Sequence, residues 1–215
     1  MSKESHLRQV LDCGIVAVVR SQDSRQLVEV ARALADGGVH VIEITMTVPH
    51  ALDVLRQVRD ALGDHILLGA GTVLDPETAR AVFLAGAEYI VSPTVNVEVI
   101  KLCQRYNKLV MPGAFTPTEI LTAWEAGADI VKVFPAENLG PAFFKAMRGP
   151  LPQIRLMPTG GVDLNTASEF LKAGACALGI GGQMVEPKAV ANRDFDRLRD
   201  LAKQYVSIVK QTRTA

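Results

Sequence analysis

The sequence lacks an excess of charge of either sign. It carries 23 lysine and arginine residues against 23 aspartate and glutamate residues, for a formal net charge of +0. No global field therefore attracts nucleic acid or an anionic membrane. Long apolar runs are also missing, because glycine, proline or charge interrupts each one before it reaches the length of a membrane span. The polar residues 1–6 do not resemble the apolar core of a signal peptide. We expect no nucleic-acid partner and no membrane partner.

Cysteine and histidine are scarce. The three cysteines, Cys13, Cys103 and Cys176, are widely separated, and we interpret them as reduced packing residues of a cytoplasmic protein. The four histidines have no mutual metal spacing, so no metal site is expected. No G-x-G-x-x-G motif follows the first strand-like segment, and Ser92 has no G-x-S-x-G context. These absences disfavour a doubly wound dinucleotide fold and a serine hydrolase.

What the sequence does contain is an alternation of short β-branched runs with amphipathic helical patterns from end to end. Such alternation is typical of βαβ units, in which helices cover a parallel sheet. Strands are expected at Ile15–Val19, His40–Thr45, Ile66–Gly69, Tyr89–Val91, Leu109–Met111, Asp129–Val133, Ile154–Met157 and Ala177–Ile180. Helices are expected at Ser24–Ala35, Ala51–Ala61, Pro76–Ala85, Val97–Tyr106, Pro117–Ala126, Asn165–Ala173 and Arg193–Val209. This pattern predicts a single-domain (β/α)8 TIM barrel over residues 1–215, with a doubly wound open sheet as the alternative.

Lys132 supplies the one ammonium group of an apolar run, residues 128–135, that is expected to be a buried strand. An ammonium group in such a run is costly unless it is paired or has lost its proton, and desolvation lowers the pKa of a lysine. A neutral amine can attack a ketone and form a Schiff base. The alternative is a lysine at a strand end that reaches solvent or pairs with Glu137.

Two further charged residues are expected near Lys132, because the carboxyl ends of barrel strands face the active site. Glu43 interrupts a second apolar strand. It either exchanges protons with Lys132 through water or forms a structural ion pair. Arg20 follows the first strand and is either a planar clamp for a carboxylate or phosphate or a solvated loop residue.

Glycine pairs follow the last two strands. Thr159-Gly160-Gly161-Val162-Asp163 leads into a helix for which Asp163 is the expected N-cap, and Gly181-Gly182 follows the final strand. Glycines let backbone N–H groups approach an anion closely, and these two loops commonly bind phosphate in such barrels. The two turns predict a phosphate site; the alternative is that the glycines only permit tight turns.

These motifs resemble those of the 2-keto-3-deoxy-6-phosphogluconate (KDPG) / 4-hydroxy-2-oxoglutarate aldolase family, whose members are class I aldolases. The resemblance keeps the order of the motifs and covers essentially the whole chain. The matching stretches are residues 15–20, 38–47, 69–74, 91–93, 112–113, 132–137, 157–161 and 179–182. The Lys-x-Phe-Pro segment together with the glutamate of the second strand makes the resemblance specific.

The resemblance implies roles for these residues. Lys132 would form the Schiff base and Glu43 would be the acid and base. The substrate would be held by Arg20, Thr47, Thr72, Pro93, Phe134, Thr159, Gly160, Gly161, Gly181, Gly182 and Gln183. Two positions depart from many members. Thr47 replaces a carboxylate-binding arginine, whose role Arg20 would take, and Gln183 replaces a phosphate-binding serine but can still donate from its amide.

The resemblance also implies a reaction and a quaternary structure, and two alternatives stand beside it. The reaction is cleavage of KDPG to pyruvate and glyceraldehyde 3-phosphate, or of 4-hydroxy-2-oxoglutarate to pyruvate and glyoxylate, with the galactonate epimer as a further substrate. The protein would be a homotrimer and would need no cofactor, because the imine withdraws electrons. One alternative is a phosphate-binding barrel enzyme of the epimerase, decarboxylase or thiamine-phosphate-synthase type that forms no Schiff base. The other is a phosphosugar-binding protein without activity.

Overall fold

Parallel strands pair in the order in which they follow one another along the chain. The computed structural model describes residues 2–214 and contains a six-stranded sheet, β5-β4-β3-β2-β1-β9, and a three-stranded sheet, β6-β7-β8. The strands are β1 Ile15–Val19, β2 Val41–Thr45, β3 Leu67–Gly71, β4 Tyr89–Val91, β5 Leu109–Met111, β6 Gly113–Ala114, β7 Val131–Val133, β8 Leu156–Pro158 and β9 Leu178–Ile180. From β1 to β5 the order never reverses, whereas a doubly wound sheet requires a reversal.

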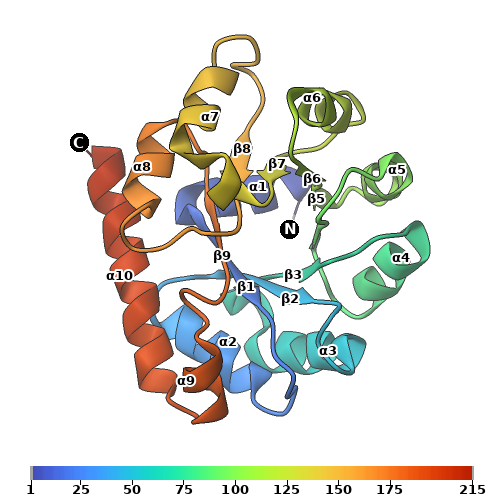
Figure 1. Cartoon of the computed structure of the whole chain (residues 1–215). Helices are drawn as coiled ribbons and strands as arrows, with labels where there is room; N and C mark the ends of the chain where they lie inside the picture. Colours follow the sequence, from blue (N-terminus) through green and yellow to red (C-terminus); the bar gives the residue numbers. More distant parts are fainter. Residues whose placement is uncertain (1, 215) are drawn as a thin grey trace.

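The two sheets are joined at two places. Pro112 alone separates β5 from β6, and an isolated parallel bridge links Thr159, after β8, to Gly179 in β9. The result is a curled parallel sheet in the middle of the molecule with helices around its outside (Figure 1). The predicted α/β class is therefore confirmed, and the carboxyl ends of the strands lie toward one end of the sheet.

The helices connect successive strands and agree with most of the expected segments. They are α1 Lys3–Cys13, α2 Leu27–Asp36, α3 Ala51–Leu62, α4 Pro76–Leu84, α5 Val97–Arg105, α6 Pro117–Glu125, α7 Gly140–Met147, α8 Ala167–Lys172, α9 Pro187–Ala191 and α10 Phe195–Thr214, with 3-10 turns at Gly63–His65 and Ala136–Asn138. The sequence did not predict α7 and α9, because both are short and contain proline in the first turn.

Side-chain caps fix where several helices begin. Asp75 accepts a hydrogen bond from the Thr78 N–H group at the start of α4, and Thr116 forms a capping box with Glu119 at the start of α6. The prediction that Asp163 is the N-cap of its helix is wrong. Its carboxylate instead accepts from the N–H groups of residues 165 and 166, in the turn that precedes α8.

The apolar core has two parts. The larger part lies between the sheet and the outer helices. The smaller part, the inner layer, fills the amino-terminal end of the curled sheet and consists of Val10, Val16, Val41, Leu67, Tyr89, Val91, Leu109, Met111, Ile130, Met157 and Ala177. Helix α1 packs Leu7 and Leu11 against this layer. Because this end is filled and covered, the carboxyl ends of the strands are the place left for a site.

Candidate active site

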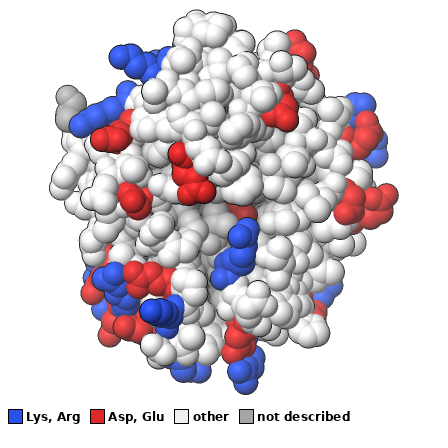
Figure 2. All heavy atoms as spheres, in the orientation of Figure 1, with Lys and Arg blue, Asp and Glu red and all other residues white. Residues whose placement is uncertain are grey.

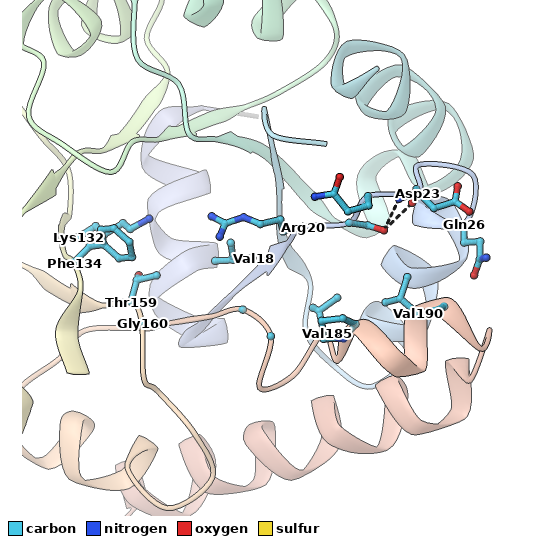
Figure 3. Close-up of a pocket in the computed structure, with 16 residues that line it drawn as sticks. Val18, Arg20, Asp23, Gln26, Lys132, Phe134, Thr159, Gly160, Val185 and Val190 are labelled. Atoms are coloured by element: carbon cyan, nitrogen blue, oxygen red, sulfur yellow. Dashed lines mark hydrogen bonds between the residues drawn. The ribbon is translucent and has the colours of Figure 1, made fainter. Parts of the chain in front are cut away.

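A cavity of about 680 Å³ lies at the carboxyl ends of the strands (Figure 3). This volume suits a small molecule. The residues that line it are Val18, Arg20, Ser21, Gln22, Asp23, Gln26, Lys132, Phe134, Thr159, Gly160, Gly181, Gly182, Val185, Pro187, Val190 and Ala191. They come from β1 and the loop after it, from β7, from the turns that follow β8 and β9, and from α9.

Lys132 brings its amine to this cavity from the middle of β7. The residue is 6% exposed, and its Nζ atom lies 4.9 Å from the centroid of the Phe134 ring. Burial lowers the pKa of Lys132; the charge of Glu43 opposes this shift, and the charge of Arg20 adds to it. Among residues 2–214, Lys132 forms no ion pair, so the alternative of a pair with Glu137 is not found. Its neutral form is favoured relative to that of a solvated lysine.

Glu43 is buried in the middle of β2 with only 1% of its surface exposed. Its carboxyl group lies over Gly71 of the neighbouring strand, since a Cβ atom there would be 1.6 Å from Glu43 Oε1. The other oxygen, Oε2, is buried and has no hydrogen-bond partner in the described chain. Burial raises the pKa of Glu43, whereas the charges of Lys132 and Arg20 lower it.

These two groups affect one another without forming a direct ion pair. Each charge stabilises the other, and burial destabilises both charged forms. An amine with a lowered pKa and a carboxyl with a raised pKa are the kinds of groups that exchange protons near neutral pH. The arrangement therefore supports nucleophilic and acid–base chemistry at the inner end of the cavity.

Arg20 lies across the cavity from Lys132. The residue is exposed, and Figure 3 shows its guanidinium directed toward the Lys132 amine. Its charge lowers the pKa of Lys132 and of Glu43, which places the guanidinium near both groups. A guanidinium in this position can bind an anionic group of a ligand through paired hydrogen bonds.

The turns after β8 and β9 differ in whether their folding requires glycine. Gly160 and Gly161 have φ angles of 89° and 72°, and a Cβ atom on Gly161 would be 2.3 Å from Glu137 Cβ. Folding alone therefore requires glycine at 161. A Cβ atom on Gly182 would meet no heavy atom within 4 Å, and this residue lines the cavity. Packing gives no reason for glycine at 182, so its backbone is open to a ligand.

Six of the sequence-predicted residues do not line the cavity. These are Glu43, Thr47, Thr72, Pro93, Gly161 and Gln183. Glu43 nevertheless acts on Lys132 through its charge. Thr72 directly follows Gly71 and has a φ angle of 58°, a conformation that is strained for a β-branched residue. Thr47 and Gln183 are exposed, and the Thr47 hydroxyl oxygen lies 2.8 Å from that of Thr45.

Several lining residues were missed by the sequence reasoning. Ser21, Gln22, Asp23 and Gln26 extend the cavity from the loop after β1, and α9 adds an apolar wall. Asp23 forms an ion pair with Arg25, and hydrogen bonds from the Arg25 side chain and backbone lower the pKa of Asp23 to about 2. A polar loop of this composition carries no motif, and α9 was not predicted, so no sequence signal identified this part.

Outside this cavity, residues 2–214 also carry charged and potential metal-binding side chains. On the face in Figure 2, acidic and basic side chains lie in small scattered groups, and much of the surface between them is uncharged. Within residues 2–214, no three histidine, cysteine or acidic side chains are grouped as metal ligands. None of the helices in that range is long and apolar enough to cross a membrane.

A buried amine and a buried carboxyl beside a cavity, at the carboxyl ends of parallel strands, define an enzyme that acts on a small molecule. Comparison with known proteins gives the family: residues 6–201 match the family model described as KDPG and KHG aldolase. The chain belongs to the KDPG and KHG aldolase family, and its activity is that of an aldolase, a carbon–carbon lyase.

Individual relatives agree with this assignment along nearly their whole length. The 2-dehydro-3-deoxy-phosphogluconate aldolase of Treponema pallidum is 37% identical, over 91% of this chain and 93% of the relative. The 2-dehydro-3-deoxy-6-phosphogalactonate aldolase of Escherichia coli is 32% identical, over 91% and 96%. A KDPG aldolase from Legionella pneumophila, solved with pyruvate captured as a covalent carbinolamine intermediate, superposes with a TM-score of 0.86. It is 27% identical, over 94% of this chain and 97% of that one.

Proposed function

We propose that this aldolase cleaves a 2-keto-4-hydroxy acid to pyruvate and an aldehyde through a Schiff base on Lys132. The observation that carries this proposal is the buried amine with a lowered pKa at the inner end of the cavity, within the electrostatic reach of Glu43. The covalent pyruvate intermediate of the Legionella relative supports the same chemistry. The substrate candidates are KDPG, its galactonate epimer and 4-hydroxy-2-oxoglutarate.

The proposed reaction begins with attack of the neutral Lys132 amine on the C2 ketone. Glu43 moves the protons through carbinolamine to imine, and water leaves. The protonated imine then accepts the electron pair of the C3–C4 bond while Glu43, directly or through water, removes the proton of the C4 hydroxyl. The aldehyde leaves, the enamine takes a proton at C3, and water hydrolyses the imine to free pyruvate and the amine.

The same proposal assigns the substrate contacts. Arg20 binds the carboxylate, Phe134 forms the wall beside the imine, and Thr159 contacts the pyruvyl end. The backbone of Gly160, Gly181 and Gly182 receives a phosphate, since these glycines line the cavity. Thr47, Thr72, Pro93, Gly161 and Gln183 remain candidates that a bound substrate would bring into contact.

We further infer the architecture and the assembly. Counting β5 and β6 as one strand interrupted at Pro112 gives a single-domain (β/α)8 barrel. Leu84, Tyr106 and Leu121 are exposed large apolar residues on or next to α4, α5 and α6, and we infer that such residues contribute to the contact of a homotrimer. Three free cysteines fit a cytoplasmic location. Light scattering of the purified protein measures the number of subunits.

Reduction with borohydride in the presence of pyruvate tests the covalent step. We expect a stable adduct on Lys132, identified by peptide mass, and none on Lys101 or Lys172, which lie on outer helices. A folded protein that gives no adduct would contradict the Schiff-base mechanism. Turnover by a Lys132→Arg variant would favour the barrel enzyme without a Schiff base.

A retro-aldol assay identifies the substrate. KDPG, the galactonate epimer and 4-hydroxy-2-oxoglutarate are compared, with lactate dehydrogenase detecting pyruvate. The expected outcome is that kcat/KM for one of the phosphorylated sugar acids exceeds that for hydroxyglutarate. Thermal stabilisation by these compounds without any pyruvate would indicate a binding protein instead.

A further inference from the structure

Tyr89 and Glu43 face the same side of the curled sheet with no side chain between them. In the strand register, Glu43 of β2 is opposite Gly69 of β3, and Gly69 is opposite Tyr89 of β4. Adjacent strands are about 4.8 Å apart, so the Cα atoms of Glu43 and Tyr89 are roughly 10 Å apart. A glutamate and a tyrosine side chain together can extend across most of that distance.

Glycines in β3 let both side chains extend over that strand. A Cβ atom on Gly69 would be 2.3 Å from Tyr89 Cζ, and one on Gly71 would be 1.6 Å from Glu43 Oε1. The hydroxyl end of the tyrosine ring and the carboxyl group therefore both lie above β3, having reached it from opposite sides. The two glycines are two residues apart, on the same face of the strand.

Both side chains carry an oxygen that is buried and unpartnered. Tyr89 is fully buried, and its hydroxyl has no hydrogen-bond partner in the described chain. The same is true of Glu43 Oε2. On its other side, Tyr89 packs in the apolar inner layer. Buried polar groups are satisfied in almost all native proteins, and one ordered water can satisfy two of them.

We propose that Tyr89 is a positioning residue for Glu43: a buried water accepts a hydrogen bond from the Tyr89 hydroxyl and donates one to Glu43 Oε2. This bond fixes the carboxyl group and leaves Oε1 for proton transfer. The role of this water bridge in catalysis rests on the proposed function, whereas the existence of the bridge does not.

The bond has a definite effect on the protonation of Glu43. A donor stabilises the carboxylate, so it opposes burial, which raises the pKa of Glu43. The other titratable groups that act on Glu43 are Lys132 from β7 and Arg20 after β1. Those that act on Tyr89 are Glu43 and Cys13, at the end of α1. Removing the Tyr89 hydroxyl therefore raises the pKa of Glu43 further, with Lys132 and Arg20 unchanged.

A Tyr89→Phe variant tests this proposal in the free protein. The Glu43 carboxyl is titrated by infrared spectroscopy, and a Glu43→Gln variant identifies its band. We expect half-protonation about one pH unit higher in Tyr89→Phe, which is about a tenfold change in proton affinity. The matched control is Tyr205→Phe, which removes a hydroxyl from another buried tyrosine, on α10. An unchanged titration in Tyr89→Phe would overturn the proposal.

Two further measurements keep the test independent of folding and of the assigned reaction. A high-resolution crystal structure of the unmodified protein is expected to contain a water within hydrogen-bond distance of Tyr89 Oη and Glu43 Oε2; a dry gap would refute the bridge. In the retro-aldol assay, kcat/KM falls at acid pH, and the midpoint of this fall is expected to be about one pH unit higher in Tyr89→Phe than in the unmodified protein. A purely structural role would lower activity without moving that midpoint. If no substrate is cleaved, the proposed function fails, while the titration and the crystal structure still decide the role of Tyr89.

Discussion

The carboxyl group of Glu43 occupies the space that a side chain at Gly71 would fill. The two residues are on adjacent strands, and the register places Gly71 opposite Thr45, two residues beyond Glu43. An added Cβ atom would be 1.6 Å from Glu43 Oε1, far inside contact distance. Glu43, the proposed acid and base, can therefore hold this position only if residue 71 has no side chain.

Replacing Gly71 by alanine is expected to displace the Glu43 carboxyl. We expect kcat to fall at least about tenfold, with a stability loss of about 1–3 kcal/mol from overpacking. The pyruvate adduct on Lys132 should still form, because the amine is not displaced, but it should form more slowly, since the proposal assigns to Glu43 the proton transfers that lead to the imine. Steady-state kinetics and urea denaturation measure the two effects. The control is Gly149→Ala, where the nearest atom to the new Cβ is 3.4 Å away. Unchanged kcat in Gly71→Ala would contradict the role of Glu43.

A Glu43→Gln variant separates the base from the nucleophile. We expect kcat to fall by about 10²–10⁴, the usual contribution of a general base. The negative charge of Glu43 raises the pKa of Lys132, so its removal lowers that pKa further. The neutral amine then forms at lower pH, and the midpoint of borohydride trapping against pH moves downward. Glu98→Gln, on the exposed face of α5, serves as control. A midpoint that moves upward would refute the electrostatic coupling.

Arg20→Gln is expected to act in the opposite direction on the amine. The charge of Arg20 lowers the pKa of Lys132, so its loss raises that pKa and moves the trapping midpoint to higher pH. Loss of a charge-assisted hydrogen bond to the substrate carboxylate should raise KM by about 10–100-fold. Arg56→Gln, on α3 and paired with Asp53, is the control. An unaltered KM would assign carboxylate binding to another residue.

Gly181→Ala tests the phosphate site without straining the backbone. The nearest atoms to an added Cβ are 3.9 Å away, in Val18, so the variant should fold normally. The new methyl group faces the cavity and should raise KM for a phosphorylated substrate about tenfold, with KM for hydroxyglutarate unchanged. An equal change for both substrates would show that the turn does not select phosphate.

Lys132→Met reveals the burial of the amine through the pH dependence of stability. In the folded protein, the pKa of Lys132 is lower than its ordinary value of 10.5. At a pH between the pKa of Lys132 in the folded protein and its pKa in the unfolded chain, the unfolded chain binds more protons. The free energy of unfolding of the unmodified protein therefore rises with pH in this range. The variant lacks this titration. Its stability advantage should therefore be largest near neutral pH and shrink toward pH 10.5, as urea denaturation can show. A constant difference would mean that the amine is solvated.

The sequence predicted those site residues that carry a charge within an otherwise apolar strand. Lys132 and Glu43 each interrupt an apolar strand, and this local contrast can be seen without knowing the fold. Most strand positions followed from the same apolar runs. The expected end of β3 at Gly69 falls short, because the strand continues through Gly71, and glycine carries no apolar signal.

The sequence could not reveal relationships that depend on strand register. Tyr89 looks like one more buried strand residue, and only its alignment with Gly69 and Glu43 brings its hydroxyl near the site. The polar residues after β1 line the same cavity as residues of α9, which no local pattern indicates. Likewise, the exposure of Gln183 depends on the turn after β9.

Helix α1 and the inner layer fill one end of the curled sheet, so the Lys132 amine lies at the closed inner end of the cavity. Under the proposed chemistry, both products must depart by the mouth through which the substrate came in. The aldehyde, nearer that mouth and not covalently held, goes first, and pyruvate follows after hydrolysis. Product inhibition should reflect this order: pyruvate competes with the substrate for the empty enzyme, whereas the aldehyde recombines with the waiting enamine and drives carbon–carbon bond formation.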